Sequence, residues 1–299
     1  MCHTCGRTFA ATTGTAFYRL RTAADLVTVV LTLLSHGCPP QAIVAAFALD
    51  ERTVAAWLAR AGTHCRQVQE HLVQSGEVDL QHVQADELWV KLVGQRVWMA
   101  LALAVPSRLW LGGAISAQRD LVLITALVQQ IRACARRLDV LVCVDGLASY
   151  VTAFRRVFRT PVPTGRRGRP PLELAAGFLL GQVVKHYAKR RVTRVEQRVV
   201  QGTAGAIAHK LDTLSAGMYL VGSAYNFCWP HASLRRLAPG GTGRKWQERT
   251  PAMAAGLTDH CWTLCELLSY QVPLPAWIPP KRRGRPPKQA PPPALAVAA

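Results

Sequence analysis

The stretch LVCVDGLASY, Leu141 to Tyr150, decides how the rest of the chain can fold. Its first half is an apolar run, which predicts a strand that is buried on both faces and therefore central in a sheet. Asp145 ends the run, and a helix with Tyr150, Phe154 and Phe158 on one side is expected behind it. An aspartate in this position either caps the following helix or serves a site at the end of the strand.

The residues before this strand predict three antiparallel strands and a helix. Leu80–Ser116 alternates apolar and polar positions and contains continuous apolar runs, which are split by Gly94 and by Pro106. Leu121–Arg137 repeats apolar residues at helical spacing. The resulting order is strand, strand, strand, helix, strand, helix, which is the order of the ribonuclease H fold. In such a sheet the first and fourth strands are neighbours.

Two aspartates are expected to meet in this sheet. Asp86 lies inside the first predicted strand and Asp145 ends the fourth. Two like charges held close together repel each other unless a cation lies between them, and carboxylate oxygens favour Mg²⁺ or Mn²⁺. We therefore expect Asp86 and Asp145 to be catalytic, metal-binding residues with Mg²⁺ (or Mn²⁺) as cofactor. Glu87 should point to the opposite face of its strand and is not expected to bind metal.

The charge of the chain indicates a polyanionic partner. Lys and Arg number 36 against 17 acidic residues, a formal net charge of +19. Double-stranded DNA is the expected partner, and a highly charged bystander such as a ribosomal protein is the alternative. The nine cysteines have no disulfide-like rhythm and the N-terminus shows no leader. A cytoplasmic protein without membrane association is therefore expected.

Residues 21–75 predict a helix-turn-helix DNA-binding domain. One helix begins near Ala24, a second covers Gln41–Phe47, and Asp50 caps a third. The third would be the recognition helix. Its expected DNA-contacting residues are Arg52, Thr53 and Arg60. Any three-helix bundle can show this spacing, so the positive charge of the chain is what favours DNA.

The pair Cys2 and Cys5 forms half of a zinc ribbon. A structural zinc site needs four ligands, normally from two such pairs. We interpret residues 1–20 as a residual half ribbon in which zinc is not expected. A loose site completed by His3, His36 or another chain is the alternative.

Two basic motifs contain Arg-Gly-Arg-Pro, the core of an AT-hook. One lies in an internal loop at residues 164–171, and the other opens a Pro-rich tail at residues 271–299 that is expected to be disordered. Such a backbone can lie in a narrow A·T minor groove while its arginines enter the negative potential there. The expected DNA contacts are Arg167, Gly168, Arg169, Arg283, Gly284 and Arg285. A solvated basic loop that contacts any phosphate is the alternative.

Six stretches between residue 2 and about residue 270 resemble those of one protein family and occur in the same order as in that family. They are CHTCGRTFAATTGT, DELWV, CVDGLASY, QVVKHYAKRRVTRVEQRVVQGT, YNFCWPHASLR and RTPAMAAGLTDHCW. With them the chain resembles bacterial insertion-sequence transposases of the IS-one type and their close relatives, whose core is a DDE-type ribonuclease H domain. The resemblance implies that Asp86 and Asp145 are the first two metal-binding aspartates and that Trp89 packs beside the site. It also implies metal-dependent cleavage and strand transfer at element ends, by a homo-oligomer on DNA.

The third acid of that family is missing from its usual place. The relatives carry a glutamate on a helix between the RVV-GT strand and the YNF helix, whereas here VVQGT leads through AGAIAHK directly to the next helix. Glu196 has a tempting spacing but lies on the charged face of a predicted strand, where arginines can pair with it. Asp212 is a weaker candidate. A catalytically inactive remnant that only binds DNA, for example as a repressor, is therefore the alternative function.

The expected fold class is mixed α/β. A ribonuclease H-like catalytic core at residues 80–235 would follow the helix-turn-helix, and a helical extension at residues 236–270 would follow the core.

Overall fold

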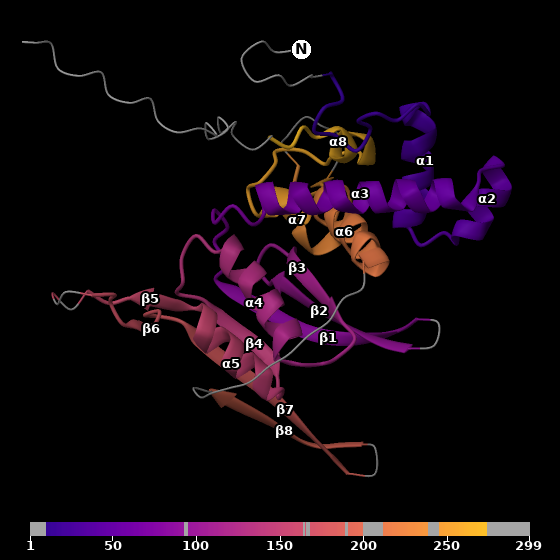
Figure 1. Cartoon of the computed structure of the whole chain (residues 1–299). Coiled ribbons are helices and arrows are strands. Elements are labelled where there is room, and N and C mark those ends of the chain that lie inside the picture. The colour runs from indigo at the N-terminus through magenta and orange to yellow at the C-terminus, as the bar shows by residue number, and fades with distance from the viewer. Residues whose placement is uncertain are drawn as a thin grey trace, which may run out of the picture.

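The computed structural model describes residues 10–92, 95–163, 165, 168–188, 191–199, 212–238 and 245–273. It is a mixed α/β fold in which one group of helices lies at an end of a twisted sheet (Figure 1). The helices are α1 Ala24–Ser35, α2 Pro40–Phe47, α3 Glu51–Leu72, α4 Leu121–Cys134, α5 Ala148–Val157, α6 Asp212–Phe227, α7 Pro251–Ala254 and α8 Leu264–Ser269.

The strands form one large sheet and two small ribbons. The large sheet has the order β3-β2-β1-β4-β7-β8. Its strands are β1 His82–Leu92, β2 Gln95–Ala104, β3 Leu109–Ser116, β4 Leu141–Asp145, β7 Leu179–Ala188 and β8 Arg191–Val199. The ribbons pair β5 Arg159–Pro161 with β6 Leu172–Leu174, and β9 Arg236–Leu237 with β10 Trp246–Gln247.

The pairing of the strands confirms the first half of the expected topology. β1, β2 and β3 are antiparallel neighbours, and β4 runs parallel to both β1 and β7. β4 is therefore central, as its apolar sequence predicts. Val142 and Val144 are buried on one face of β4, and Cys143 is half-buried on the other.

Helices α4 and α5 pack against each other, and α4 covers β2 and β3. Tyr150 and Phe154 of α5, and Phe158 directly after it, are fully buried as expected. The rings of Phe154 and Phe158 both contact the ring of Phe178.

Helix α4 was predicted to reach Arg137 but ends at Cys134. It ends early because the next residues hydrogen-bond elsewhere: the Arg136 N–H donates to the Val78 carbonyl.

The three N-terminal helices follow the predicted positions closely. The Asp50 side chain accepts a hydrogen bond from the Arg52 N–H at 2.8 Å and caps α3. Val54 and Trp57 are buried on the inner side of α3. α3 extends over 22 residues, which is longer than the recognition helix of a helix-turn-helix needs to be.

Buried hydrogen bonds join this helical group to the sheet. β3 is an edge strand, and the side chain of Asn226 on α6 both accepts from the Trp110 N–H and donates to the Trp110 carbonyl, each at 2.8 Å. Gln69 on α3 donates to the same carbonyl at 3.2 Å. Asn226 and Gln69 have no exposed surface. The helices of the expected DNA-binding region and α6 of the expected core region therefore share one interior.

The crossing of α3 and α6 leaves no room for a side chain at Gly62. A Cβ atom there would lie 2.4 Å from the Cα atom of Ala216. Gly62→Ala should lower the free energy of unfolding by at least about 2 kcal/mol, because the two backbones must separate. Gly217→Ala on α6 is the control, since a Cβ there meets no atom within 4 Å. It should leave stability unchanged or raise it by about 0.5–1 kcal/mol. Thermal unfolding that ranks the two variants in the opposite order would contradict this packing.

The C-terminal extension packs against the N-terminal segment. The Ala16 N–H donates to the Leu268 carbonyl, and the Val272 N–H donates to the Gly14 carbonyl. α7 and α8 are short, so the expected helical extension consists largely of loops and the β9–β10 ribbon. In the part of the chain that the structure describes, no helix is long and apolar enough to cross a membrane.

Candidate metal site and nucleic-acid contacts

Asp86 and Asp145 lie side by side on neighbouring parallel strands. The last backbone pair between β1 and β4 is Gln84 with Cys143, and the two aspartates stand two residues further along each strand. Residues at the same level of adjacent strands point to the same face of a sheet. Asp86 is exposed, and the side chain of Asp145 is 37% exposed. The expectation that the two carboxylates meet is confirmed.

Glu87 joins them, which the sequence analysis did not expect. Carboxylate oxygens of Asp86, Glu87 and Asp145 all lie within 4.8 Å of one another, so Glu87 could join a metal site that it was expected to leave to the two aspartates. Its side chain is buried whereas Asp86 is exposed, as expected for neighbouring residues on opposite faces of a strand. The backbone pairing of β1 with β4 ends at Gln84 and Cys143. Beyond it, a cation bridges the carboxylates of Glu87 and Asp145.

That cation is Arg119, which precedes α4. Its Nη2 atom donates to Glu87 Oε2 at 2.7 Å and to Asp145 Oδ2 at 2.6 Å. Its guanidinium also lies 5.3 Å from the ring centroid of Trp98. Asp145 Oδ1 accepts from the Leu147 N–H at 2.9 Å, so the same aspartate supports the start of α5 and belongs to the acid cluster. Because α5 has no side-chain cap, Asp145 supports the turn before the helix and does not cap it, and its role as a metal ligand stays a prediction.

Burial and the neighbouring charges set the protonation of the cluster. The side chain of Glu87 has no exposed surface, and burial, together with the charge of Asp145, raises its pKa while Arg119 opposes the rise. Burial disfavours the charged form of Arg119, but its bonds to Glu87 and Asp145 outweigh burial and raise its pKa. Burial and the Glu87 charge raise the pKa of Tyr150. A charged Arg119 therefore stabilises ionised Glu87 behind the two aspartates.

A cleft of about 670 Å³ opens onto this cluster. Asp86, Arg119 and Asp145 line it, and Glu87 lies behind Arg119. Gln182 on β7 donates to the carbonyls of Asp145 and Leu147 and so holds the turn between β4 and α5 in place. Three carboxylates at the end of a sheet fit a hard divalent cation. On its buried side Glu87 faces the hydroxyl of Tyr150, whose hydrogen bond also lowers the pKa of the carboxyl.

Glu196 does not belong to the cluster. It pairs with Val184 on β7, whereas Asp145 pairs with the preceding residue, Val183. Consecutive residues of a strand point to opposite faces, so Glu196 and Asp145 face opposite sides of the sheet. Glu196 Oε2 lies 3.9 Å from Arg194 Nη2, and the predicted salt bridge on the strand face is confirmed. Asp212 begins α6, and the segment 200–211, where the third acid was sought, lies outside the described residues.

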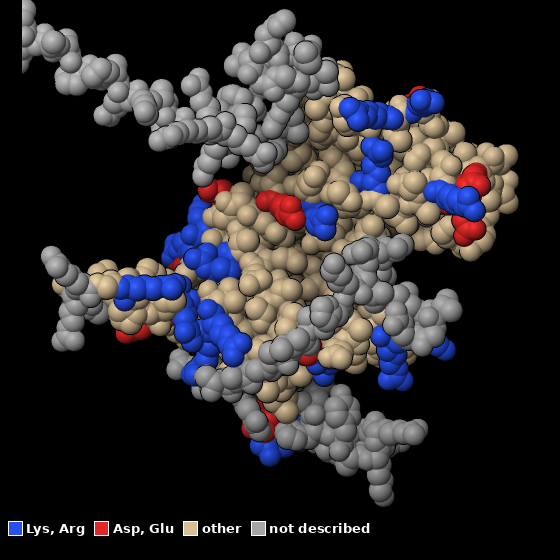
Figure 2. Space-filling view, viewed as in Figure 1, with Lys and Arg blue, Asp and Glu red and all other residues tan. Residues whose placement is uncertain are grey.

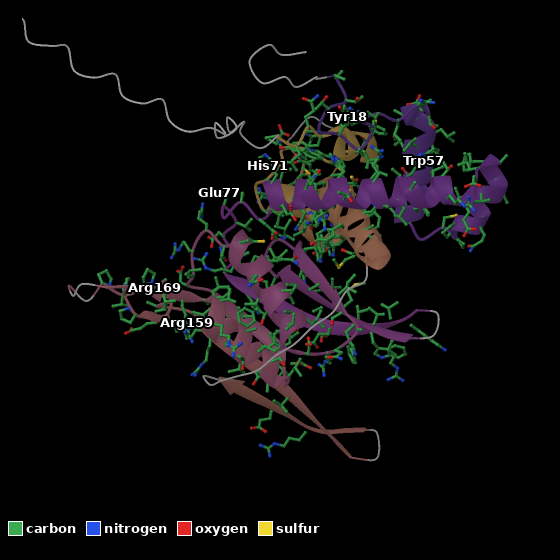
Figure 3. All side chains as sticks on the ribbon, in the orientation of Figure 1. Tyr18, Trp57, His71, Glu77, Arg159 and Arg169 are labelled. Atoms are coloured by element: carbon green, nitrogen blue, oxygen red, sulfur yellow. The ribbon has the colours of Figure 1, made fainter. Side chains whose placement is uncertain are left out.

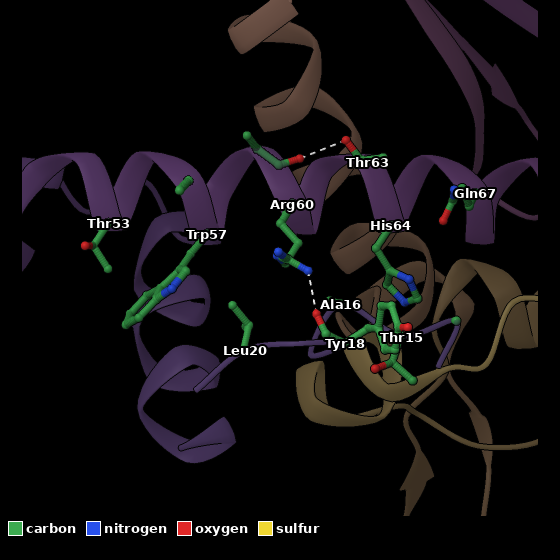
Figure 4. A pocket seen from close by; sticks show the side chains of 13 residues that line it. Thr15, Ala16, Tyr18, Leu20, Thr53, Trp57, Arg60, Thr63, His64 and Gln67 are labelled. Carbon is green, nitrogen blue, oxygen red and sulfur yellow. Dashed lines mark hydrogen bonds between the residues drawn. The ribbon is translucent and has the colours of Figure 1, made fainter. Parts of the chain in front are cut away.

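The three candidate DNA-contacting residues of the predicted recognition helix, α3, differ in their exposure and contacts. Arg52 is exposed near the start of α3, and Thr53 is half-buried. Arg60 Nη1 donates to the Tyr18 carbonyl at 2.7 Å. Figure 4 shows Thr53, Trp57 and Arg60 pointing to one side of α3, toward Tyr18 and Leu20, in a groove of about 710 Å³. The N-terminal segment therefore lies along much of the face that was expected to read DNA, and Arg52 is the candidate that stands clear of it.

The internal AT-hook-like motif lies in the loop of the β5–β6 ribbon, which projects from the body (Figure 1). Gly168 has a φ of +119°, which favours glycine, and Arg169 is exposed. Figure 3 shows Arg159 and Arg169 along this ribbon, and Figure 2 shows Lys and Arg side chains gathered near its base. Three groups of predicted residues lie outside the described residues: Arg167, the tail residues Arg283, Gly284 and Arg285, and the cysteines Cys2 and Cys5.

Sequence reasoning missed Arg119 and Glu87 as members of the site. One signal was present: Arg119 and Asp120 stand between the predicted third strand and the following helix, at the end of the sheet where β4 also finishes. No protein-family model and no curated protein matches the chain.

Proposed function

We propose that the chain is the DNA transposase of an insertion sequence, with a ribonuclease H-like core that cleaves DNA strands and transfers them in a metal-dependent reaction. The observation that carries the proposal is the placement of Asp86 and Asp145 at one level of two adjacent parallel strands. The order of elements from β1 to α5, with β4 central, is the order expected of such a core. The six sequence stretches that resemble such transposases support the same conclusion.

Asp86 and Asp145 are the residues that would hold Mg²⁺ or Mn²⁺, with Glu87 close behind them. A divalent cation held there supplies Lewis-acid stabilisation of the charge that develops on phosphoryl oxygens. The residues of the chain supply the surroundings. Gln182 and the Leu147 N–H fix the position of Asp145, and Arg119 places a positive charge in the cleft where a phosphate would approach.

Double-stranded DNA, both element ends and target, is the proposed partner. The excess of 36 basic over 17 acidic residues suits a phosphate backbone. Arg52 on α3 and Arg169 on the β5–β6 ribbon are exposed cations on two separate projections of the molecule. Such a protein would act as a homo-oligomer on DNA, in the bacterial nucleoid.

A second candidate function is favoured by one observation. Arg119 bridges Glu87 and Asp145 at 2.7 and 2.6 Å and so fills the space between carboxylates that a metal ion would need. Glu196 lies on the other face of the sheet and adds no ligand to this cluster. In this second candidate the chain is a catalytically inactive DNA-binding remnant such as a repressor. Supercoiled plasmid incubated with the purified chain and Mn²⁺ separates the two: nicked circles support the transposase, and intact plasmid that is nevertheless bound supports the remnant.

Binding to duplex DNA should weaken steeply with salt. Each neutralised phosphate contributes about −0.9 to the slope of log affinity against log salt concentration. A flat response would remove nucleic acid as the partner of either candidate function.

Arg169→Ala should weaken binding to an A·T-rich duplex more than to a G·C-rich duplex, because an arginine in a narrow minor groove senses its enhanced negative potential. Arg159→Ala is the control. Arg159 lies at the base of the same ribbon and donates to the Arg155 carbonyl, so its loss should weaken both duplexes equally. If Arg169→Ala lowered the affinity for both duplexes equally, the loop would be a basic surface that contacts any phosphate and not an A·T-selective motif. Anisotropy titrations with both duplexes measure this.

A further inference from the structure

One face of the β1–β2 hairpin exposes a large aromatic side chain. Trp89 is 52% exposed, and the guanidinium of Arg96 lies 4.9 Å from its ring centroid. Tryptophan is usually largely buried, so an exposed ring beside a cation indicates a surface that contacts something. Figure 1 shows the tip of this hairpin extending beyond the helices.

The exposed ring belongs to a strip that leads to the acid cluster. Trp89 stands directly across from Trp98, and Lys91 stands across from Arg96. These four side chains lie on one face of the hairpin, because residues two apart on a strand point the same way. Lys91 and Arg96 are exposed, and Trp98 is half-buried. The strip lies on the same face of β1 as Glu87, opposite to Asp86. Arg119 joins this face to the acid cluster, because its guanidinium contacts Trp98 and bonds both Glu87 and Asp145.

We propose that this strip, formed by Trp89, Lys91, Arg96 and Trp98, binds an unpaired DNA strand, with a base stacked on Trp89 and phosphates on Lys91 and Arg96. Every base has a π-face that an aromatic ring can stack on, and stacking contributes about 1–3 kcal/mol per base. The two cations complement the phosphate backbone. Paired bases in a duplex hide their faces, so the platform requires a strand that is open beside the site.

The inference deepens and rests on the proposed function, since an unpaired strand next to the carboxylates is the strand that would react. A protein partner is less well matched. An interface with another protein would have to accommodate Lys91 beside the ring, and lysine is depleted at such interfaces. A nucleic-acid strand uses both the rings and the cations.

The test measures binding of a fluorescent oligo-thymidine single strand and of a blunt duplex to the full chain in EDTA. Trp89→Ala should weaken single-strand binding by about tenfold, which corresponds to about 1.4 kcal/mol, and change duplex binding less than twofold. Trp89→Phe should keep most of the single-strand affinity, because it retains a stacking ring. Trp246→Ala is the matched control: Trp246 is 38% exposed with Arg235 at 4.7 Å from its ring, but it lies on β10 outside the large sheet. It should leave the single-strand affinity unchanged.

Equal losses on single strand and duplex would overturn the inference and make the strip a plain cationic surface. No loss on either would also overturn it, and a change of oligomeric state in Trp89→Ala by sedimentation would assign the strip to a second copy of the chain. Binding in EDTA needs no metal, so it is independent of catalysis. Selective single-strand binding by a chain that never nicks DNA would uphold the inference while the proposed transposase activity fails.

Discussion

Asp145→Asn should abolish Mn²⁺-dependent nicking of plasmid DNA by the chain, a loss of at least about a hundredfold. Removing even an outer-sphere partner of a metal ligand lowers metal affinity or activity 10- to 100-fold, and Asp145 would itself be a ligand. Asparagine keeps an oxygen that can accept from the Leu147 N–H at the start of α5, so the fold should survive. Asp86→Asn should have the same effect. The rate of conversion of supercoiled to open-circular plasmid is the measurement.

Glu196→Gln is the matched control for this loss. Glu196 is an acidic residue on the same sheet, but it faces the other side and lies near Arg194. Nicking by this variant should equal that of the parent, with thermal unfolding confirming that both variants are folded. Robust nicking that Glu196→Gln abolishes would show that a third acid acts from the face that we regard as solvated, and the assignment of the site would be wrong.

Arg119→Met should increase the affinity of the chain for Mn²⁺ by about tenfold. A guanidinium hydrogen-bonded to Glu87 and Asp145 competes with a metal ion for the same oxygens, and it also repels the incoming cation. A unit charge about 4 Å away contributes up to about 4 kcal/mol near a protein surface, and solvent at this half-exposed group reduces that figure to the order of 1 kcal/mol. Calorimetric titration with Mn²⁺ in the absence of DNA measures the change.

Two further variants make this result interpretable. Arg137→Met removes a comparable arginine that pairs with Asp139 on the surface, and it should leave Mn²⁺ affinity unchanged. Arg119→Met alone leaves Glu87 buried without its cation, which destabilises the fold. The double variant Arg119→Met with Glu87→Gln removes both charges and keeps the test open if the single variant unfolds. Weaker Mn²⁺ binding by both variants would mean that Arg119 assembles the carboxylates instead of competing for them.

The outcome also separates the two candidate functions. Tighter metal binding together with faster nicking in the Arg119 variant would mean that the site is complete and held back by its own arginine. Tighter metal binding without nicking would mean that the chemistry needs a ligand beyond Asp86, Glu87 and Asp145, as the inactive remnant requires.

Much of the fold could be predicted because its signals are local. The apolar run before Asp145 indicated a central strand, and β4 lies between β1 and β7. Alternation along the first three strands, and the cap at Asp50, placed β1 to β3 and α3 within a few residues. The end of α4 was misjudged, because the residues after Cys134 pair with Val78, which lies far away in the sequence.

For the candidate site, the sequence by itself determined that Asp86 and Asp145 share one end of the sheet. Strand order and the period of two settle which residues of adjacent strands can meet. Only the tertiary structure decided the rest: the Glu87 carboxylate lies within 4.8 Å of the two aspartates, Arg119 lies between the carboxylates, and Glu196 faces the other side of the sheet. The physical reason is that a strand pattern specifies the direction in which each side chain leaves the backbone. The conformation of a long charged side chain depends instead on which opposite charge the folded chain brings within reach.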